Sequence, residues 1–403
     1  MKRILLLFLA LLLVLTLPAC IRLDPLYGED ASDTATEDEG RDEASDAATD
    51  GESEQETQKQ PELTLPIWSD ADGTAQIFFE ATDTIVDSTK REYSYAEMCD
   101  DLAELSAAYP NKFTYESIGR SVAGREIYAI CLGNPNAPRQ ILVSAGIHGR
   151  EYLTPLLAMK QLEFYLRYWS VGAYNGIRYS DLFDRCAFYI VPMSNPDGIM
   201  LSQAGIDSIT DTALRQKVES VYESDRRRGY TSQTDIDEYL KFWKANANGV
   251  DLNRNFDALW ADYRGEPTES HKNYKGPSAA SEPETRALAA LTESLSNPVA
   301  VLCIHSQGEV LYWDCGQSQP LRDNTLAFTR EIANRTGYSI IYEVNNDASF
   351  SDWCALNRGL IAITVETGIG SCPLFIDKFT AIWTDNYDLL PLSAYYFEQN
   401  GAG

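Results

Sequence analysis

The sequence predicts an α/β fold in which a mixed or parallel β-sheet is covered by helices on both faces. From about Ser94 onward, apolar runs typical of buried strands alternate with longer segments of helical periodicity. The chain has 403 residues, 44% of them hydrophobic, which is enough for a large core. No internal repeat and no linker-like break appears after residue 92, so residues 92–403 are expected to form a single domain.

The first half of this domain is predicted to contain two helices, a hairpin and two buried strands. Ser94 and Glu97 form a capping-box pattern that opens a helix ending near Pro110. The predicted elements that follow are a hairpin over 115–133, a central strand over 139–147, a helix over 152–169 and a buried strand over 186–192. The string SNPDG after that strand is typical of a turn.

The second half continues the alternation. Residues 210–247 have helical patterning with an arginine-rich interruption at 224–235. We interpret the segment 222–236 as a surface insertion that rims the site. Ser281 and Glu284 form a second capping-box pattern before a helix that ends near Leu295. The remaining predictions are strands over 298–305, 309–314 and 360–367, a helix over 326–336 closed by Gly337, and a largely helical end over 374–397.

The N-terminus has the pattern of an export signal. Residues 1–19 combine a short basic start with a leucine-rich run that is too short for a comfortable membrane span. The run ends in LPAC, which is similar to the lipobox of bacterial lipoproteins, where Cys20 would carry the lipid. Pro18 is unusual in that motif, so ordinary cleavage after Ala19 remains an alternative. We therefore expect an exported protein anchored to the cell membrane through Cys20.

Residues 20–91 are expected to be a disordered acidic tether followed by a short lead-in. The tract up to about residue 65 has almost no aromatic residues and no apolar period, so it cannot bury enough surface to fold. The segment 66–91 is either packed on the sheet or more tether. The formal net charge of the whole chain is −27, which argues against nucleic acid as a partner.

The cysteines do not indicate a cysteine zinc site, because none lies in a CxxC pair. If Cys20 carries lipid, seven remain, and the odd number leaves at least one free thiol. Export would permit disulfides among the others, but their pairing does not follow from the sequence.

Two of the three histidines in the chain follow apolar strands, and this makes them candidate metal ligands. His148 ends the run ILVSAGI and His305 ends VAVLCI, and ligands gather beyond the carboxyl ends of strands in α/β sheets. Glu151, three residues after His148, completes a set of two histidines and one carboxylate, as catalytic zinc sites use. Taken alone, HxxE also arises by chance, and a histidine at a strand end can be a core residue.

Further polar residues make the metal interpretation stronger. Glu366 ends the apolar run LIAITVE, where a carboxylate needs a partner. Asn253 and Arg254 in GVDLNRNF offer planar donors suited to a carboxylate. Together these groups suggest hydrolysis of an acylated amino compound with a free carboxylate near the cut. His271 lies in a polar stretch, ESHKNYKG, and is expected at the surface.

Six motifs occur in one order, and together they resemble the zinc metallocarboxypeptidases, the carboxypeptidase A-like family. They are HGRE at 148–151, NPDG at 195–198, GVDLNRNF at 249–256, YKGPSAASEPET at 274–285, IHSQGE at 304–309 and TVETG at 364–368. The similarity covers about residues 92–398. It implies a three-layer α/β/α sandwich around a mixed sheet of eight strands.

The resemblance also implies roles for individual residues. It makes His148, Glu151 and His305 the ligands of one zinc ion per chain and Glu366 the general base that activates a zinc-bound water. It assigns the substrate's terminal carboxylate to Asn253 and Arg254, and a contact on the acyl side to Arg150.

Three further roles depart from the family pattern. Lys244 stands where the family usually has an arginine that polarises the scissile carbonyl. Tyr342 lies near the family's mobile tyrosine, with a different spacing to the Asp352-Trp353 pair. Ser351 occupies a position that shapes the pocket for the released residue, and as a serine it indicates neither a basic nor an apolar one.

The strings around these residues are most similar to the bacterial branch that cuts peptidoglycan stem peptides between γ-D-glutamate and a diamino acid, usually meso-diaminopimelate. The alternatives are a general carboxypeptidase that trims scavenged peptides and a non-catalytic binding lipoprotein. In each case we expect a peptide partner and a monomeric protein.

Overall fold

The computed structural model describes residues 71–401. The predicted signal peptide, the lipidation site Cys20 and the acidic tract up to residue 70 lie outside the described residues. Within residues 71–401, no helix combines the length and the hydropathy needed to cross a bilayer.

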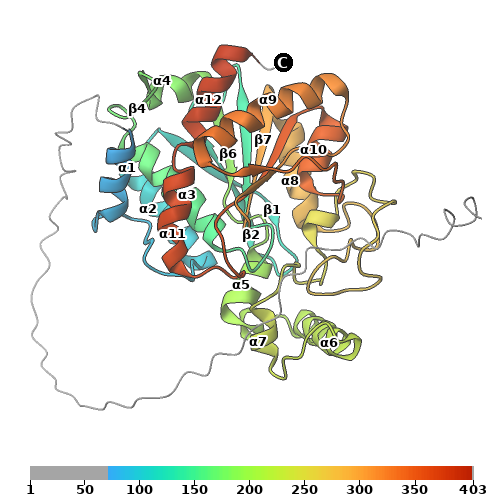
Figure 1. Cartoon of the computed structure of the whole chain (residues 1–403). Coiled ribbons are helices and arrows are strands. Elements are labelled where there is room, and N and C mark those ends of the chain that lie inside the picture. The colour runs from blue at the N-terminus through green and yellow to red at the C-terminus, as the bar shows by residue number, and fades with distance from the viewer. Residues whose placement is uncertain (1–70, 402–403) are drawn as a thin grey trace, which may run out of the picture. The chain divides into compact units, whose positions relative to one another are not determined.

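A mixed β-sheet forms the centre of the described part of the chain (Figure 1). Its eight strands are in the order β1-β2-β6-β3-β7-β10-β8-β9. The strands are β1 Phe113–Arg120, β2 Glu126–Leu132, β3 Gln140–Ala145, β6 Ala187–Val191, β7 Pro298–His305, β8 Val310–Tyr312, β9 Ser339–Ile340 and β10 Ile361–Glu366, with a separate pair β4 Ala173–Tyr174 and β5 Ile177–Arg178. Strands β6, β3, β7 and β10 are parallel neighbours. Their carboxyl ends therefore meet at one edge of the sheet.

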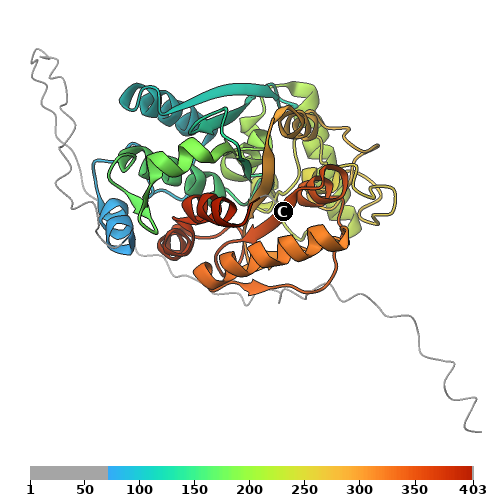
Figure 2. The same ribbon diagram turned by 90° about the horizontal axis from the view of Figure 1, so that it is seen from above.

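Helices cover both faces of this sheet (Figures 1 and 2). The helices of the described residues are α1 Ala71–Glu80, α2 Tyr95–Ala108, α3 Leu153–Arg167, α4 Tyr179–Arg185, α5 Pro196–Ala204, α6 Thr212–Arg228, α7 Ile236–Leu240, α8 Pro283–Ser294, α9 Gln319–Thr336, α10 Phe350–Arg358, α11 Phe379–Asn386 and α12 Leu389–Asn400. Helices α3, α9, α11 and α12 share one hydrophobic core with the sheet, and α8 and α10 share a second core on the other face. The predicted three-layer α/β/α sandwich is confirmed.

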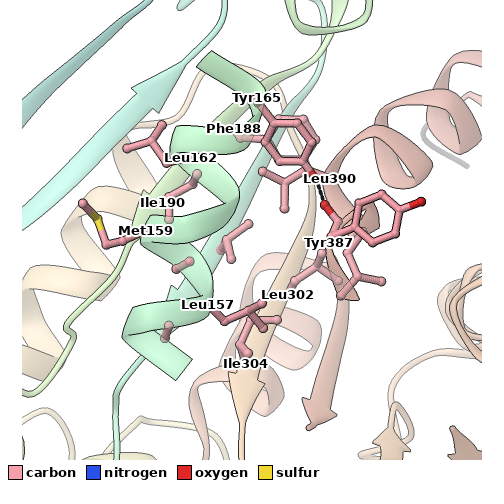
Figure 3. Packing of buried hydrophobic residues seen from close by; sticks show 14 of the residues in the cluster. Leu157, Met159, Leu162, Tyr165, Phe188, Ile190, Leu302, Ile304, Tyr387 and Leu390 are labelled. Carbon is pink, nitrogen blue, oxygen red and sulfur yellow. Dashed lines mark hydrogen bonds between the residues drawn. The ribbon is translucent and has the colours of Figure 1, made fainter. Parts of the chain in front are cut away.

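The two cores follow from the two-residue period of the strands. In β3, Ile141 and Val143 belong to the core under α3, whereas Leu142 faces the core under α8 and α10. A strand buried on both faces needs apolar residues at every position, which explains the continuous apolar runs of the sequence. Figure 3 shows the first core, where Leu157 of α3 packs near Leu302 and Ile304 of β7.

A third, smaller core lies below the sheet edge and belongs to helices α5, α6 and α7 (Figure 1). Its fully buried members include Leu201, Val218, Leu240 and Trp243. Residues 210–247 are thus a folded lobe with its own apolar centre. The predicted arginine-rich interruption is wrong at its start, because α6 continues through Arg228 and ends at Gly229, whose φ of 77° is left-handed.

Two helix starts differ from the sequence-based prediction. NPDG is not a turn, because Asn195 caps α5 by accepting the N–H of Gly198 and Pro196 takes the first helical position. The second capping box is absent, since Glu282 is the N-cap and Ser281 donates its hydroxyl to the Glu282 carboxylate. The capping box of Ser94 and Glu97 is confirmed.

Part of the lead-in before residue 92 packs against the main domain. Phe78 of α1 is fully buried against Phe164 and Trp383. Glu163 of α3 accepts the backbone N–H groups of residues 85 and 86, and the buried Lys160 donates to the carbonyl of residue 86. The lead-in therefore packs against helices α3 and α11, and these contacts are not with the sheet itself.

Candidate active site

Three predicted metal ligands meet at the carboxyl edge of the sheet. Nδ1 of His148 lies 2.8 Å from Oε1 of Glu151, and Nδ1 of His305 lies 3.1 Å from Oε2 of the same carboxylate. The two imidazole nitrogens are 3.2 Å apart, and all three side chains are buried. Among the described residues this is the one group of potential ligands whose donor atoms all lie within 4.8 Å of one another.

The local fold explains why these residues converge. His305 is the last residue of β7, and His148 and Glu151 occupy the tight connection between β3 and α3. Gly149 sits between them because a Cβ there would lie 2.3 Å from the carbonyl oxygen of Gly198 and 2.8 Å from that of Trp243. The glycine of HGRE is therefore required by the close approach of its backbone to NPDG and to the segment at Trp243.

Asp251 orients the ring of His148 from behind. Its Oδ1 lies 3.3 Å from Nε2 of His148, on the opposite side of the ring from Glu151. Its two oxygens also accept the backbone N–H groups of Asn253 and Asn273. Burial acts to raise the pKa of Asp251, but the neighbouring His148 and two cations outweigh it and hold the pKa well below its usual range. An ionised carboxylate behind a histidine helps to orient the ring for metal binding.

The donor set fits a zinc ion. Two imidazole nitrogens and one carboxylate are the ligand types that a catalytic zinc site uses, with a further position left open. Burial opposes ionisation of Glu151, but the two imidazoles hold its pKa well below the usual range, so the carboxylate stays charged. His148 also lines the cavity described next, so the ligand set adjoins a space that a substrate can enter.

A cavity of ≈ 160 Å³ adjoins the ligand set. It is lined by six of the predicted site residues, which are His148, Lys244, Asn253, Arg254, Ser351 and Glu366. The cavity therefore unites residues that are spread over more than two hundred positions of the chain.

Glu366 lies next to the metal ligands because β10 and β7 are parallel neighbours and Glu366 is in register with His305. Burial raises the pKa of Glu366 to about 7, and the nearby Glu151 adds to this, although His305 and Lys244 oppose it. A carboxylate with a pKa near neutrality can both accept and return a proton.

Asn253 and Arg254 form one wall of the cavity in the short helical turn η2 Leu252–Arg254. The Asn253 side-chain oxygen accepts the N–H of Phe350. Arg254 donates to the hydroxyl of Tyr263 and to the carbonyl of Asn253, and its Nη2 lies 3.4 Å from Oδ2 of Asp347. The guanidinium is thus held firmly at the place where a substrate carboxylate is expected.

Lys244 reaches the site from the lobe of α6 and α7. Its Nζ lies 3.9 Å from Oε1 of Glu151. Its backbone N–H donates to the carbonyl of His271, and its own carbonyl accepts the N–H of Gly149. The lysine therefore supplies a positive charge beside the metal ligands from a backbone that is tied on both sides.

The predicted surface position of His271 is wrong. Its side chain is buried, and Nδ1 lies 2.8 Å from Oδ2 of Asp225 on α6. Asp225 also accepts from the hydroxyls of Tyr239 and Ser270 and from the guanidinium of Arg228. A polar local sequence suggested exposure, whereas these polar residues are turned inward to satisfy one buried carboxylate.

Two predicted substrate contacts, Arg150 and Tyr342, are not among the described residues that line the cavity. Tyr342 is 61% exposed, and its ring packs edge-on against Trp313, which does line the cavity. Ser351 lines the cavity and shares its hydroxyl with Ser349 and Thr364. The substrate contacts of these residues remain predictions.

Sequence reasoning missed Asp251 and Asp347, although both stand in strings that contain other site residues. Asp251 is part of GVDLNRNF, and its spacing of two residues from Asn253 was a usable signal. Asp347 had no comparable signal, because its position depends on the loop after β9.

The described cysteines carry no disulfide. All seven, Cys99, Cys131, Cys186, Cys303, Cys315, Cys354 and Cys372, have free thiols. Cys372 lies beside the site with its sulfur 3.5 Å from the Ser306 hydroxyl, and burial raises its pKa to about 11. Cys372 does not belong to the cluster of close donor atoms, so among the described residues the site is one of two histidines and a glutamate.

The fold and this site define a metallopeptidase of the zinc carboxypeptidase class. The family model "Zinc carboxypeptidase" matches residues 98–387. The chain is 31% identical over 299 residues to gamma-D-glutamyl-L-diamino acid endopeptidase 1 of Lysinibacillus sphaericus, covering 73% of this chain and 70% of that protein. It is 26% identical over 250 residues to carboxypeptidase B of Homo sapiens, covering 59% and 52% of the two chains.

A solved structure supports the same fold. The crystal structure of thrombin activatable fibrinolysis inhibitor matches with a TM-score of 0.61 and 16% identity, covering 82% of this chain and 81% of that chain. The chain therefore belongs to the zinc carboxypeptidase family, whose members are zinc-dependent peptidases.

Proposed function

We propose that this protein is a zinc peptidase that hydrolyses the bond between γ-D-glutamate and a diamino acid, such as meso-diaminopimelate, in peptidoglycan stem peptides. The observation that carries the proposal is the 31% identity, over 299 residues, to a relative named for cleavage of that bond. That match is longer and higher in identity than the match to carboxypeptidase B.

The residues that line the cavity offer the groups that such a hydrolysis needs for substrate binding, proton transfer and stabilisation of the oxyanion. Bound zinc would act as a Lewis acid toward the scissile carbonyl and make a water molecule more acidic. Asn253 and Arg254 would bind the free carboxylate of the released residue and so place its amide bond beside Glu366. Glu366 would take a proton from the attacking water and return it to the leaving amine. Lys244 would lend positive charge to the developing oxyanion.

A general carboxypeptidase remains the second candidate because Asn253 and Arg254 suit any C-terminal carboxylate. The two functions differ in the bond that is cut. Purified protein would be incubated with γ-D-glutamyl-diaminopimelate stem peptides and with α-linked peptides of equal length, and the products would be weighed by mass spectrometry. Release of diaminopimelate-containing fragments alone supports the wall peptidase. Trimming of the α-linked peptides alone contradicts it.

We also propose that the protein is exported and held at the membrane by lipid on Cys20, where a cell-wall peptidase would meet its substrate. The support is the LPAC string after the leucine-rich run. Metabolic labelling with a fatty acid should tag the wild-type protein and fail to tag Cys20→Ala. Equal labelling of the two would contradict the anchor.

A further inference from the structure

The cavity is rich in acidic groups. Two cations line it, Lys244 and Arg254, together with four carboxylates, which are Glu366 beside the metal ligands and Asp314, Asp347 and Asp352. If Asn253 and Arg254 hold the free carboxylate of the released residue, the side chain of that residue must lie in this cavity. A pocket for an apolar side chain would not need carboxylates there.

Two of these carboxylates, Asp352 and Asp314, have structural partners within the protein. Asp352 accepts the backbone N–H groups of Asp347 and Ser349, and so caps the start of α10. Asp314 accepts the N–H of Gly316, forms an ion pair with Arg322 and has no exposed side-chain surface. Neither group is free to meet a ligand.

Asp347 differs because its side chain keeps 30% of its surface exposed. Its position is nevertheless fixed, since its N–H donates to Asp352 and its Oδ2 accepts from Asn345 at 2.8 Å. That same oxygen lies 3.4 Å from Nη2 of Arg254. The site thus offers an anion and a cation side by side, in a fixed arrangement.

The neutral groups near Asp347 do not provide a negative charge for a ligand. Ser351 and Thr364 place hydroxyls 3.1 Å apart in the same cavity, where they form a neutral polar surface. A substrate carboxylate that binds Arg254 competes with Asp347 for the guanidinium. A positively charged group on the same released residue would remove that conflict by giving Asp347 a partner of its own.

We propose that Asp347 is a specificity-determining residue that selects a released residue with an ammonium group in its side chain, that is, a diamino acid. The inference rests on the proposed function, because that function places the released residue in this cavity. It assigns the charge selection to the loop before α10 and not to Ser351.

The test compares two γ-D-glutamyl substrates that differ in one charge, with lysine or norleucine as the released residue. The wild-type enzyme should prefer lysine in kcat/KM by about tenfold or more, as a charged hydrogen bond implies. Asp347→Asn should lose most of that preference, because cleavage of the lysine substrate should slow more than cleavage of the norleucine substrate. Glu343→Gln is the matched control, because Glu343 is an exposed acid of the same loop that does not line the cavity.

Several results would overturn the inference while leaving the proposed function intact. These are equal cleavage of both substrates by the wild type, an equal loss on both substrates in Asp347→Asn, and the same change of preference in Glu343→Gln. If neither γ-D-glutamyl substrate is cleaved, the proposed function fails instead. The same variants would then be assayed on α-linked peptides ending in lysine or norleucine, where a lysine preference that depends on Asp347 upholds the inference and its absence overturns it.

Discussion

The active site has two halves that are held in place in different ways. The strand-end half contains His148 and Glu151, which follow β3, and His305 and Glu366, which end β7 and β10. The sheet itself therefore sets their spacing. The lobe half brings Lys244 to the same cavity from a segment whose backbone is bonded to His271, and side-chain hydrogen bonds to Asp225 hold His271 in turn. Strand geometry is regular and tolerates change around it, whereas a polar network depends on each of its members.

Asn195 joins the two halves. Its amide nitrogen donates to the carbonyls of Ile147, after β3, and of Ala245, in the lobe, and the side chain is fully buried. A substitution in one half can therefore disturb the geometry of the other. Variants in each half separate the contributions of the two halves to metal binding, catalysis and stability.

The largest effect is expected from removing a metal ligand in the strand-end half. His305→Ala takes one of three donors, so bound zinc and peptidase activity should both be lost. Chelator treatment of the wild type should have the same effect and be reversed by added zinc, as measured by metal analysis and turnover. Activity that survives exhaustive chelation would contradict a metal role for this half.

Glu366→Gln should separate metal binding from chemistry. We expect kcat to fall by about 10²–10⁴-fold, because a glutamine cannot accept the proton of the attacking water. The zinc content should stay at the wild-type level, since Glu366 is not one of the three clustered donors. Loss of zinc from this variant would show that Glu366 acts as a ligand.

Asp251→Asn should have an intermediate effect, because Asp251 acts on the metal through His148. Zinc affinity should fall by about 10–100-fold, and excess zinc should restore most of the activity. Competition with a chelator of known affinity measures the change. An unchanged affinity would mean that the backbone alone orients the His148 ring.

In the lobe half, Asp225→Asn should lower stability more than it lowers metal binding. The free energy of unfolding should fall by about 1–3 kcal/mol, because a buried carboxylate with several donors is replaced. Glu219→Gln, an exposed site on the same helix, is the control in denaturant titrations. A turnover defect that persists in a Lys244→Ala background would show that Asp225 acts on more than Lys244.

The last effect is a gain in stability and concerns Glu284, which supports the lobe by accepting from the side chain of Asn246. Burial raises the pKa of Glu284 from its ordinary 4.5 to about 8. Between these values the folded protein keeps a proton that the unfolded chain has lost, so this group lowers stability as the pH rises. Glu284→Gln should therefore gain on the order of 1–3 kcal/mol relative to the wild type between pH 5 and pH 8. A difference that does not vary with pH would mean that Glu284 titrates normally.

The strand-end half was predictable from the sequence, and the lobe half was not. His148, His305 and Glu366 each end a continuous apolar run, and such runs identify buried strands and hence the edge at which they meet. His271 and Asp225 carry no such marker, because 46 positions separate them and their neighbours are polar. Only the folded lobe shows that these polar side chains point inward. The role of Asp347 was equally hidden in the sequence, because it depends on the distance between Asp347 and Arg254 in the fold.

The unpaired cysteines have a practical consequence. Burial raises the pKa of Cys186 to about 12 and that of Cys315 to about 12, so almost no thiolate exists at neutral pH, and slow air oxidation is expected. Reducing agents should accordingly leave the melting temperature of the described domain unchanged. The stability of the described domain should therefore be the same in oxidising and in reducing buffers.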